Sequence, residues 1–197
     1  MINSPPRRWF QHFEAHLLST WEGRSPGARA VEIGCGTGYG TKLILDQFGA
    51  ATVHAVDLDP KMIARAERRL RRYAGRAFLS QGSATDLRVT LEQFGGGKDA
   101  SYEAAFDFAI IHHIPNWRDA VAEIARVLKQ GGKFFFDEVT ATALARPSFQ
   151  LLFDHPTEDR FTAGEFLAEL PRHGLEVGER WRTLVGGDYL FGVAIRQ

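Results

Sequence analysis

VEIGCGTGYG, at residues 31–40, is the segment of this 197-residue chain that decides the fold. An apolar run, 28–33, leads into the glycines, and a helical pattern, 41–48, follows them. This order predicts a buried strand, a tight turn and a helix. Because glycine has no Cβ and tolerates positive φ, such a turn lets a ligand lie against backbone N–H groups at the positive end of the helix.

The spacing of the glycines separates two classes of ligand. A dinucleotide site needs G-x-G-x-x-G, but here the glycines alternate and Tyr39 stands where the third dinucleotide glycine belongs. Glu32 would repel a pyrophosphate, whereas it could receive a ligand ammonium group. The segment resembles motif I, E-x-G-x-G-x-G, of the class I S-adenosylmethionine (SAM) dependent methyltransferases. The resemblance implies that the cofactor contacts Glu32, Gly34, Cys35 and Gly36.

Length and composition limit the alternatives. A chain of 197 residues suits a single domain, 1–197. Lys plus Arg equals Asp plus Glu, 24 each, so there is no basic excess of the kind that nucleic-acid binding requires. A single cysteine excludes a disulfide framework and fits a reducing cytoplasm. No apolar run approaches the ~20 residues of a membrane helix, so we expect a cytoplasmic protein without membrane insertion.

Strand and helix patterns alternate along the chain. They predict a doubly wound, Rossmann-like α/β fold: a seven-stranded sheet, mostly parallel, with an antiparallel C-terminal hairpin and helices on both faces. The expected strands are 28–33, 52–56, 77–80, 101–106 and 133–136, followed by a hairpin of 175–184 with 188–195. The expected helices are 9–21, 41–48, 61–73, 117–128 (capped by Asn116 and ending at Gly131 and Gly132) and 163–173.

Two acids follow the second expected strand. Asp59 with Pro60 after it is typical of a helix start, which gives Asp59 a structural role. Asp57 lies about 20 residues beyond the glycine turn, where an acid can accept hydrogen bonds from both ribose hydroxyls of an adenosine. We assign Asp57 and the adjacent Leu58 to the cofactor site.

Three further segments extend the resemblance. At 82–84 the family's G-D-A becomes Gly-Ser-Ala, which implies adenine contacts from Ser83 and Ala84. Segment 101–106 aligns with the family's S-F-D-x-V-x strand, so that Asp107 and Phe108 follow at the cofactor crevice. IIHHIP, at 110–115, matches L-H-H-x-P, and RVLKQGGK, at 126–133, resembles R-V-L-K-P-G-G-x.

His112 and His113 are the imidazoles next to this crevice, and they are our candidates for a base that takes a proton from the methyl acceptor. A structural pair at a helix start explains them at least as well. A metal site would need further ligands, so we expect no metal.

Two segments rich in aromatic residues are predicted to cover the acceptor. One is the N-terminal helix within 1–27, with core packing as the alternative role, and the other is an insertion at 140–161. Since ligand pockets are lined mainly by apolar side chains, we expect a small, apolar or aromatic acceptor. The aromatic side chains are Trp9, Phe10, Phe13 and Trp21 in the first segment, and Phe149, Phe153 and Phe161 in the second.

The resemblance covers roughly 28–197, is densest over 31–138, and points to small-molecule enzymes similar to quinone and sterol methyltransferases. A non-catalytic SAM-binding module remains an alternative. An NAD-dependent oxidoreductase would share Asp57, but the chain lacks the third glycine and a Tyr-x-x-x-Lys relay. A nucleic-acid methyltransferase would show an N/D-P-P-Y/F run after the fourth strand, and that run is absent.

Overall fold

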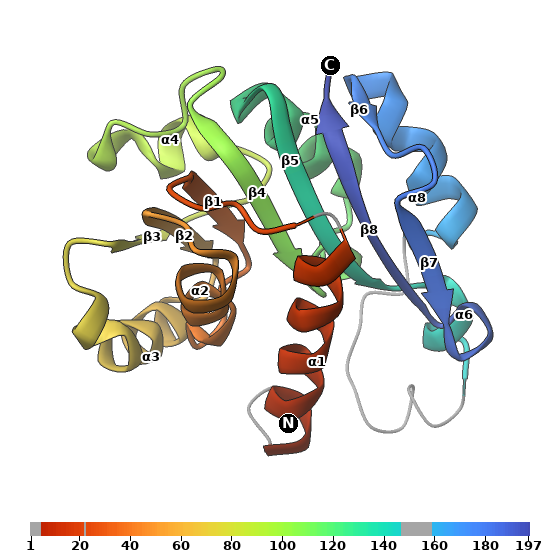
Figure 1. The fold of residues 1–197 in the computed structure, drawn as a ribbon, viewed down its shortest axis with the longest axis horizontal. Coiled ribbons are helices and arrows are strands. Elements are labelled where there is room, and N and C mark those ends of the chain that lie inside the picture. Colours follow the sequence, from red (N-terminus) through yellow and green to blue (C-terminus); the bar gives the residue numbers. More distant parts are fainter. Residues whose placement is uncertain (1–4, 22, 147–158) are drawn as a thin grey trace.

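The computed structural model describes residues 5–21, 23–146 and 159–197, and they form an α/β fold around one sheet (Figure 1). Pairing is parallel from β3 to β5, and β8 joins β5 antiparallel. The strand order is β3-β2-β1-β4-β5-β8-β6, with β7 also on β8. The strands are β1 (Arg29–Ile33), β2 (Thr52–Asp57), β3 (Ala77–Gln81), β4 (Tyr102–Phe108), β5 (Leu128–Val139), β6 (Leu175–Glu176), β7 (Trp181–Leu184) and β8 (Tyr189–Arg196).

The eight described strands occupy seven positions, because β6 and β7 pair with opposite ends of the same edge of β8. The predicted fold class, seven positions with an antiparallel C-terminal part, is therefore confirmed. The predicted hairpin strand 175–184 is wrong in detail: residues 177–180 separate β6 from β7, and only β7 forms the hairpin with β8.

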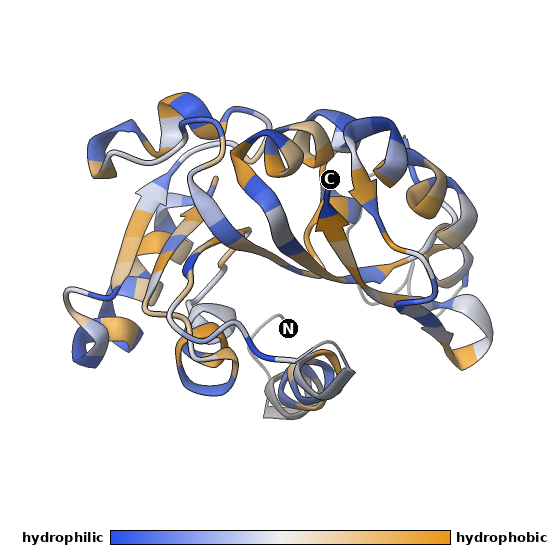
Figure 2. Ribbon diagram, turned by 45° about the horizontal axis from the view of Figure 1, so that its top comes forward, coloured by the Kyte–Doolittle hydropathy of each residue, from blue (hydrophilic) through white to orange (hydrophobic). Residues whose placement is uncertain are grey.

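Helices cover both faces of the apolar sheet (Figure 2). Side chains of α4, α5 and α8 pack in one core cluster, and those of α1, α2, η1 and α3 pack in the other. Their bounds are α1 (Pro5–Trp21), α2 (Tyr39–Leu43) continuing as the π-helical turn η1 (Ile44–Phe48), α3 (Pro60–Leu70), α4 (Leu87–Thr90), α5 (Trp117–Val127), α6 (Ala141–Leu144) and α8 (Ala163–Glu169).

Local signals fixed several helix ends. Asp59 accepts a hydrogen bond from the Lys61 amide, 2.8 Å, and caps α3 as predicted. Thr162 and Glu165 form the capping box of α8. Asn116 occupies the N-cap of α5, but its side chain does not cap the helix. It donates instead to the Asp119 carboxylate.

Two predicted boundaries are wrong because strand pairing decides them. Helix α5 stops at Val127, and β5 begins at Leu128, which pairs with Tyr102. The register then shifts before the pair Ala104–Lys133, so the two glycines at 131–132 lie in an irregular part of β5 rather than ending a helix. Strand β4 runs two residues beyond the predicted end, through Phe108.

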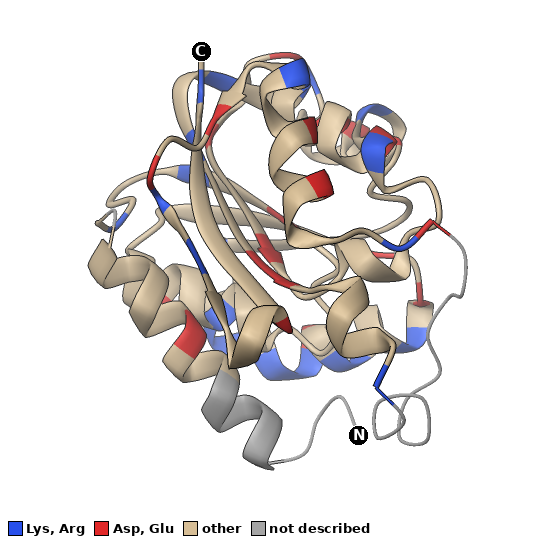
Figure 3. Cartoon of the chain, turned by 90° about the vertical axis from the view of Figure 1, so that its right-hand side faces the viewer, with Lys and Arg blue, Asp and Glu red and all other residues tan. Residues whose placement is uncertain are grey.

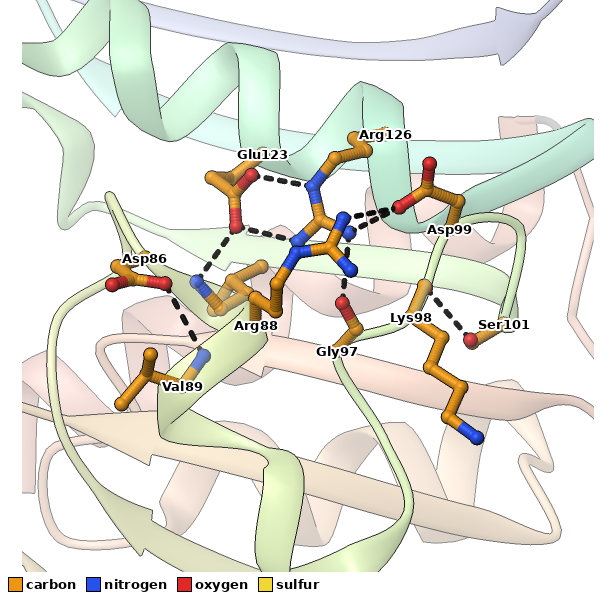
Figure 4. Close-up of polar contacts among 10 residues, drawn as sticks. Asp86, Arg88, Val89, Gly97, Lys98, Asp99, Ser101, Glu123 and Arg126 are labelled. Carbon is orange, nitrogen blue, oxygen red and sulfur yellow. Dashed lines mark hydrogen bonds and ion pairs between the residues drawn. The ribbon is translucent and has the colours of Figure 1, made fainter.

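Arg126 fastens α5 to the segments around β3 and β4 (Figure 4). Its guanidinium bonds Glu123, Asp99 and the Gly97 carbonyl oxygen at 2.5–2.8 Å. Glu123 also accepts a bond from the Leu87 amide, 2.7 Å, at the start of α4. The connection that follows β3, where Ser83 and Ala84 lie, is thus held against α5.

Helix α1 packs on the core. Ala15 and Leu18 are fully buried in the cluster of α2 and α3, and Phe13 remains 46% exposed. The side chains of Trp9 and Phe10 lie outside the described part of the structure. Among the described residues, no helix is long and apolar enough to cross a bilayer.

Trp117 at the start of α5 tests this packing. It is fully buried, and its ring lies 4.9 Å from that of Phe161 and 5.6 Å from that of Phe166, centroid to centroid. Trp117→Ala should lower the free energy of unfolding in urea by about 3–5 kcal/mol. Trp181→Ala, at a side chain 38% exposed, should cost roughly 0.5 kcal/mol or less. Equal losses in the two variants would contradict this core.

Candidate functional site

The glycine turn between β1 and α2 lets other atoms come close to its backbone. Gly34, Gly36 and Gly38 all have positive φ, from 52° to 77°. A Cβ at Gly34 would lie 2.1 Å from the Ile110 side chain, so this position must be glycine for Ile110 to pack against the turn. Around Gly36 nothing lies within 4 Å of a Cβ. The open side of the turn, where a ligand can reach backbone atoms, is therefore at Gly36.

Asp57, at the end of β2, is bonded to this turn. Its Oδ2 accepts a hydrogen bond from the Gly36 amide, 2.7 Å, and its Oδ1 accepts one from the Asp59 amide, 2.9 Å. A carboxylate offers about four acceptor positions, so each oxygen retains capacity for a second donor. Leu58 beside it is 72% exposed, although it is a large apolar residue.

Ser83 and Ala84 follow β3, next to Asp57. The Gly82 amide donates to the Asp57 carbonyl oxygen, 3.0 Å, which joins the two strand ends. The Ser83 hydroxyl accepts from the Thr85 amide, 3.1 Å, and bonds the Thr85 hydroxyl, 2.7 Å. Ala84 is half-buried against the core. The structure thus places the four predicted ribose and adenine contacts along two adjoining strand ends.

Glu32 is a buried acid beneath the turn. It accepts a 2.5 Å bond from the Thr41 hydroxyl, and a Cβ at Gly40 would lie 2.1 Å from its Oε1. Burial raises the pKa of Glu32 to about 8; the bond from Thr41 opposes the rise, and the charges of Asp57 and Asp107 add to it. A neutral acid here is poised to ionise when a cation arrives.

Cys35 contributes backbone rather than thiol chemistry. Its amide donates to the Val56 carbonyl oxygen, 2.9 Å, which holds the turn against β2. The side chain is 5% exposed, and burial raises the pKa of the thiol above its usual value. A buried, protonated thiol of this kind is a poor nucleophile.

Asp107 and Phe108 lie at the carboxyl end of β4, and both are buried. Asp107 is fully buried; its Oδ1 accepts from the Ile110 amide, 3.1 Å, and its Oδ2 accepts no hydrogen bond from the described residues. Burial, with the Glu138 charge second, raises the pKa of Asp107 well above its usual range. Phe108 is 7% exposed and lies beneath Gly40, where a Cβ would be 2.8 Å from its ring.

The two candidate histidines stand in the 3-10 turn η4 (Ile111–His113) after β4. Their rings lie against each other, 4.2 Å between centroids. His112 is buried, and its Nδ1 lies 2.6 Å from Oε2 of Glu138 at the end of β5. His113 is half-buried.

Acidic segments on the strands lie inside the molecule, between the flanking helices (Figure 3).

The predicted residues form two neighbouring groups. Glu32, Asp57 and Asp107 are close enough for their charges to act on one another, and His112 joins Asp107 through Glu138. Three residues outside the predicted set, Glu138, Thr41 and Ile110, bond members of these groups. The acid pair at 137–138, directly after three phenylalanines, was the one available signal for Glu138.

Comparison with known proteins agrees with this geometry. Residues 30–132 match the family described as "Methyltransferase domain". A fatty-acid O-methyltransferase of Mycolicibacterium smegmatis is 31% identical over 125 residues, 64% of this chain and 40% of the relative. A ubiquinone biosynthesis O-methyltransferase of Xylella fastidiosa is 30% identical over 120 residues, 60% of this chain and 45% of the relative. The chain thus spans less than half the length of these two curated relatives.

A solved structure shows the same fold. The phosphoethanolamine N-methyltransferase 2 of Haemonchus contortus, in complex with S-adenosyl-L-methionine, superposes with a TM-score of 0.74 at 18% identity, covering 95% of this chain and 52% of that one. At this identity the likeness shows the fold alone, whereas the family match covers the glycine turn and the ends of β1 to β4. The chain therefore belongs to the methyltransferase-domain family, with S-adenosyl-L-methionine as the methyl donor.

Proposed function

We propose that this chain transfers the methyl group of SAM to a small, apolar or aromatic molecule. The observation that carries the proposal is the bond from the Gly36 amide to the Asp57 carboxylate, beside open space at Gly36. This bond brings an acceptor of ribose hydroxyls to the glycine turn of a fold whose ligands bind at the carboxyl ends of the strands.

The described residues fit SAM. Asp57 would accept from the ribose hydroxyls, and Glu32, buried and held neutral in the ligand-free chain, would receive the ammonium group. The exposed Leu58 side chain offers an apolar surface for adenine, with Ser83 and Ala84 on the neighbouring strand end. Gly34 and Cys35 shape the turn, while Asp107 and Phe108 line the crevice from β4.

Bound SAM would supply an activated methyl group on a sulfonium centre. The chain must then hold the acceptor in line with that methyl group and exclude water. An acceptor oxygen or nitrogen that carries hydrogen also needs a base. His112, set in η4 at the carboxyl end of β4, is our choice for that base, with His113 packed against it.

A small buried apolar cluster lies near the end of β5. Val139, Ala143 and Leu144 pack together with Ala109 and Tyr189 at the same edge of the sheet as the glycine turn. Of the predicted aromatic cover, Phe161 is wrongly assigned: it is 1% exposed and packs in the core against Trp117 and Phe166. Phe149 and Phe153 lie outside the described residues.

Replacing Asp57 tests the cofactor site. Asp57→Ala removes a charged acceptor, so SAM affinity measured by calorimetric titration should fall roughly 10- to 150-fold, equivalent to ~1.5–3 kcal/mol. Asp59→Ala is the matched control, because it removes the cap of α3 and should lower stability by about 1 kcal/mol while leaving SAM affinity unchanged. NAD should not bind either variant or the native chain. Equal SAM affinity in Asp57→Ala and the native chain would refute the assignment.

The raised pKa of Glu32 predicts that a proton is released when the cofactor binds. The free carboxyl has a pKa of about 8 and is mostly protonated at pH 7, and an arriving ammonium group favours the ionised form. Titrations at pH 7 in two buffers of different ionisation enthalpy should therefore show release approaching about one proton per SAM. In Glu32→Gln the buffer dependence should disappear. A native chain whose binding heat is independent of the buffer would contradict the role of Glu32.

A panel of acceptors tests the proposed chemistry. Production of S-adenosylhomocysteine should be highest with apolar or phenolic molecules, such as a free fatty acid or a quinol, and should vary little between low and moderate salt. Transfer to an RNA or to an acidic peptide should be absent; binding of such a polyanion would fall steeply with salt. Steep salt dependence with the best acceptor would contradict the small apolar class. SAM binding without turnover of any acceptor would favour the non-catalytic module.

A further inference from the structure

Glu138, near the end of β5, is a fully buried carboxylate with an unusual number of donors. Three backbone amides bond it: Ile111 to Oε1 at 2.6 Å, and Val139 and His112 to Oε2 at 3.2 and 3.3 Å. The fourth contact is the His112 ring, whose Nδ1 lies 2.6 Å from Oε2. The backbone bonds alone would hold η4 against β5, so the ring bond calls for a separate explanation.

The ring bond settles where the imidazole hydrogen lies. An ionised carboxylate can only accept, so Nδ1 of His112 must carry the hydrogen that it shares with Glu138. In a neutral imidazole the lone pair then belongs to Nε2. Glu138 thus selects one tautomer and fixes the plane of the ring, with the side chains of both partners at most 3% exposed.

Backbone amides keep Glu138 in the accepting role. Burial raises the pKa of both carboxyls, Glu138 to about 7 and Asp107 well above its usual range. The bonds that Glu138 receives from Asp107, Ile111, His112 and Val139 oppose its rise. The three backbone N–H groups that donate to Glu138 favour its ionised form, so Glu138 is the acceptor of the bond with the His112 ring.

We propose that Glu138 is a positioning residue for methyl transfer: by holding Nδ1–H of His112, it makes Nε2 of that ring the atom that takes the acceptor's proton. The inference rests on the proposed function and assigns the proton to His112 rather than to His113. In the balanced step, an acceptor O–H or N–H bond breaks and its proton goes to Nε2. The acceptor's electron pair bonds the methyl carbon, and the carbon–sulfur electrons remain on sulfur.

The tautomer can be measured on the native chain without cofactor or acceptor. Long-range ¹H–¹⁵N correlation spectra, assigned through a His112→Gln variant, should show His112 protonated at Nδ1 and unprotonated at Nε2 above neutral pH. The opposite tautomer in the native chain would overturn the proposal. Because this readout needs no variant of Glu138, it decides the matter even if such variants fail to fold.

Variants then separate positioning from structural support. Glu138→Gln keeps the size of the side chain but leaves a single acceptor oxygen, so the Nδ1–H preference should weaken and kcat should fall on the order of 10²-fold, with SAM affinity within about twofold of native. Glu169→Gln is the matched control: it alters another carboxylate–histidine pair, 2.9 Å from His173, and should leave kcat unchanged. His113→Ala should keep most of the rate.

A double variant isolates the coupling to His112. In a His112→Ala background, Glu138→Gln should change kcat less than about threefold, whereas a purely structural role would lower kcat equally in both backgrounds. Rates are measured with SAM and the fastest acceptor of the panel. If no acceptor is methylated, the proposed function fails, and the His112 tautomer in the ligand-free chain still decides whether Glu138 holds Nδ1–H of that ring.

Discussion

Parallel pairing of β1, β4 and β5 brings the buried carboxyl groups of Glu32, Asp107 and Glu138 to the carboxyl ends of neighbouring strands. Ile33 pairs with Asp107 and Asp107 pairs with Phe136, so Glu32 and Glu138 lie near the ends of the strands on either side of Asp107. Burying carboxyls together is unfavourable unless they stay protonated or receive hydrogen bonds. Each receives a donor: Thr41 for Glu32, Ile110 for Asp107, and backbone amides with His112 for Glu138.

Buried acids with raised pKa values can lose their protons when a positive charge binds nearby. Raised pKa values favour the neutral forms of Glu32 and Asp107 in the ligand-free chain, which limits the repulsion among the acids, whereas Glu138 accepts bonds from three backbone amides. An ammonium or sulfonium group would reverse that balance, because a nearby cation favours the ionised acid. Proton release and cofactor binding are therefore expected to be linked at Glu32, while the proton taken from an acceptor is handled separately at His112.

Two of the glycines are needed for packing around the buried acids as well as for the turn. A side chain at Gly34 would displace Ile110, which precedes η4, and one at Gly40 would strike Glu32 and Phe108. These two glycines therefore allow the β4 connection and α2 to close over the acids. Gly36 alone of the three alternating glycines faces open space, so the backbone surface available to a ligand is smaller than the motif suggests.

Local chemistry in the sequence determined most of the elements and the position of Asp57 beside the glycine turn. Glycine spacing, the Asp59–Pro60 start of α3 and the capping box of α8 each depend on residues a few positions apart, so they can be read without a fold. The alternation of strands and helices gave the parallel sheet, and the strand ends placed Asp57 beside the turn. The resemblance at 101–115 predicted Asp107 at the carboxyl end of its strand and the histidines directly after it, and the structure has them at the end of β4 and in η4.

Contacts between distant segments were decided by the tertiary structure alone. The bond between His112 and Glu138 spans 26 residues and depends on the register of β4 against β5. The same pairing ends α5 at Val127, and packing against Trp117 moves Phe161 from a predicted pocket wall into the core. Sequence patterns record which residues are apolar or acidic. Which of them meet is set by strand register and burial, because these arise only when the whole sheet assembles.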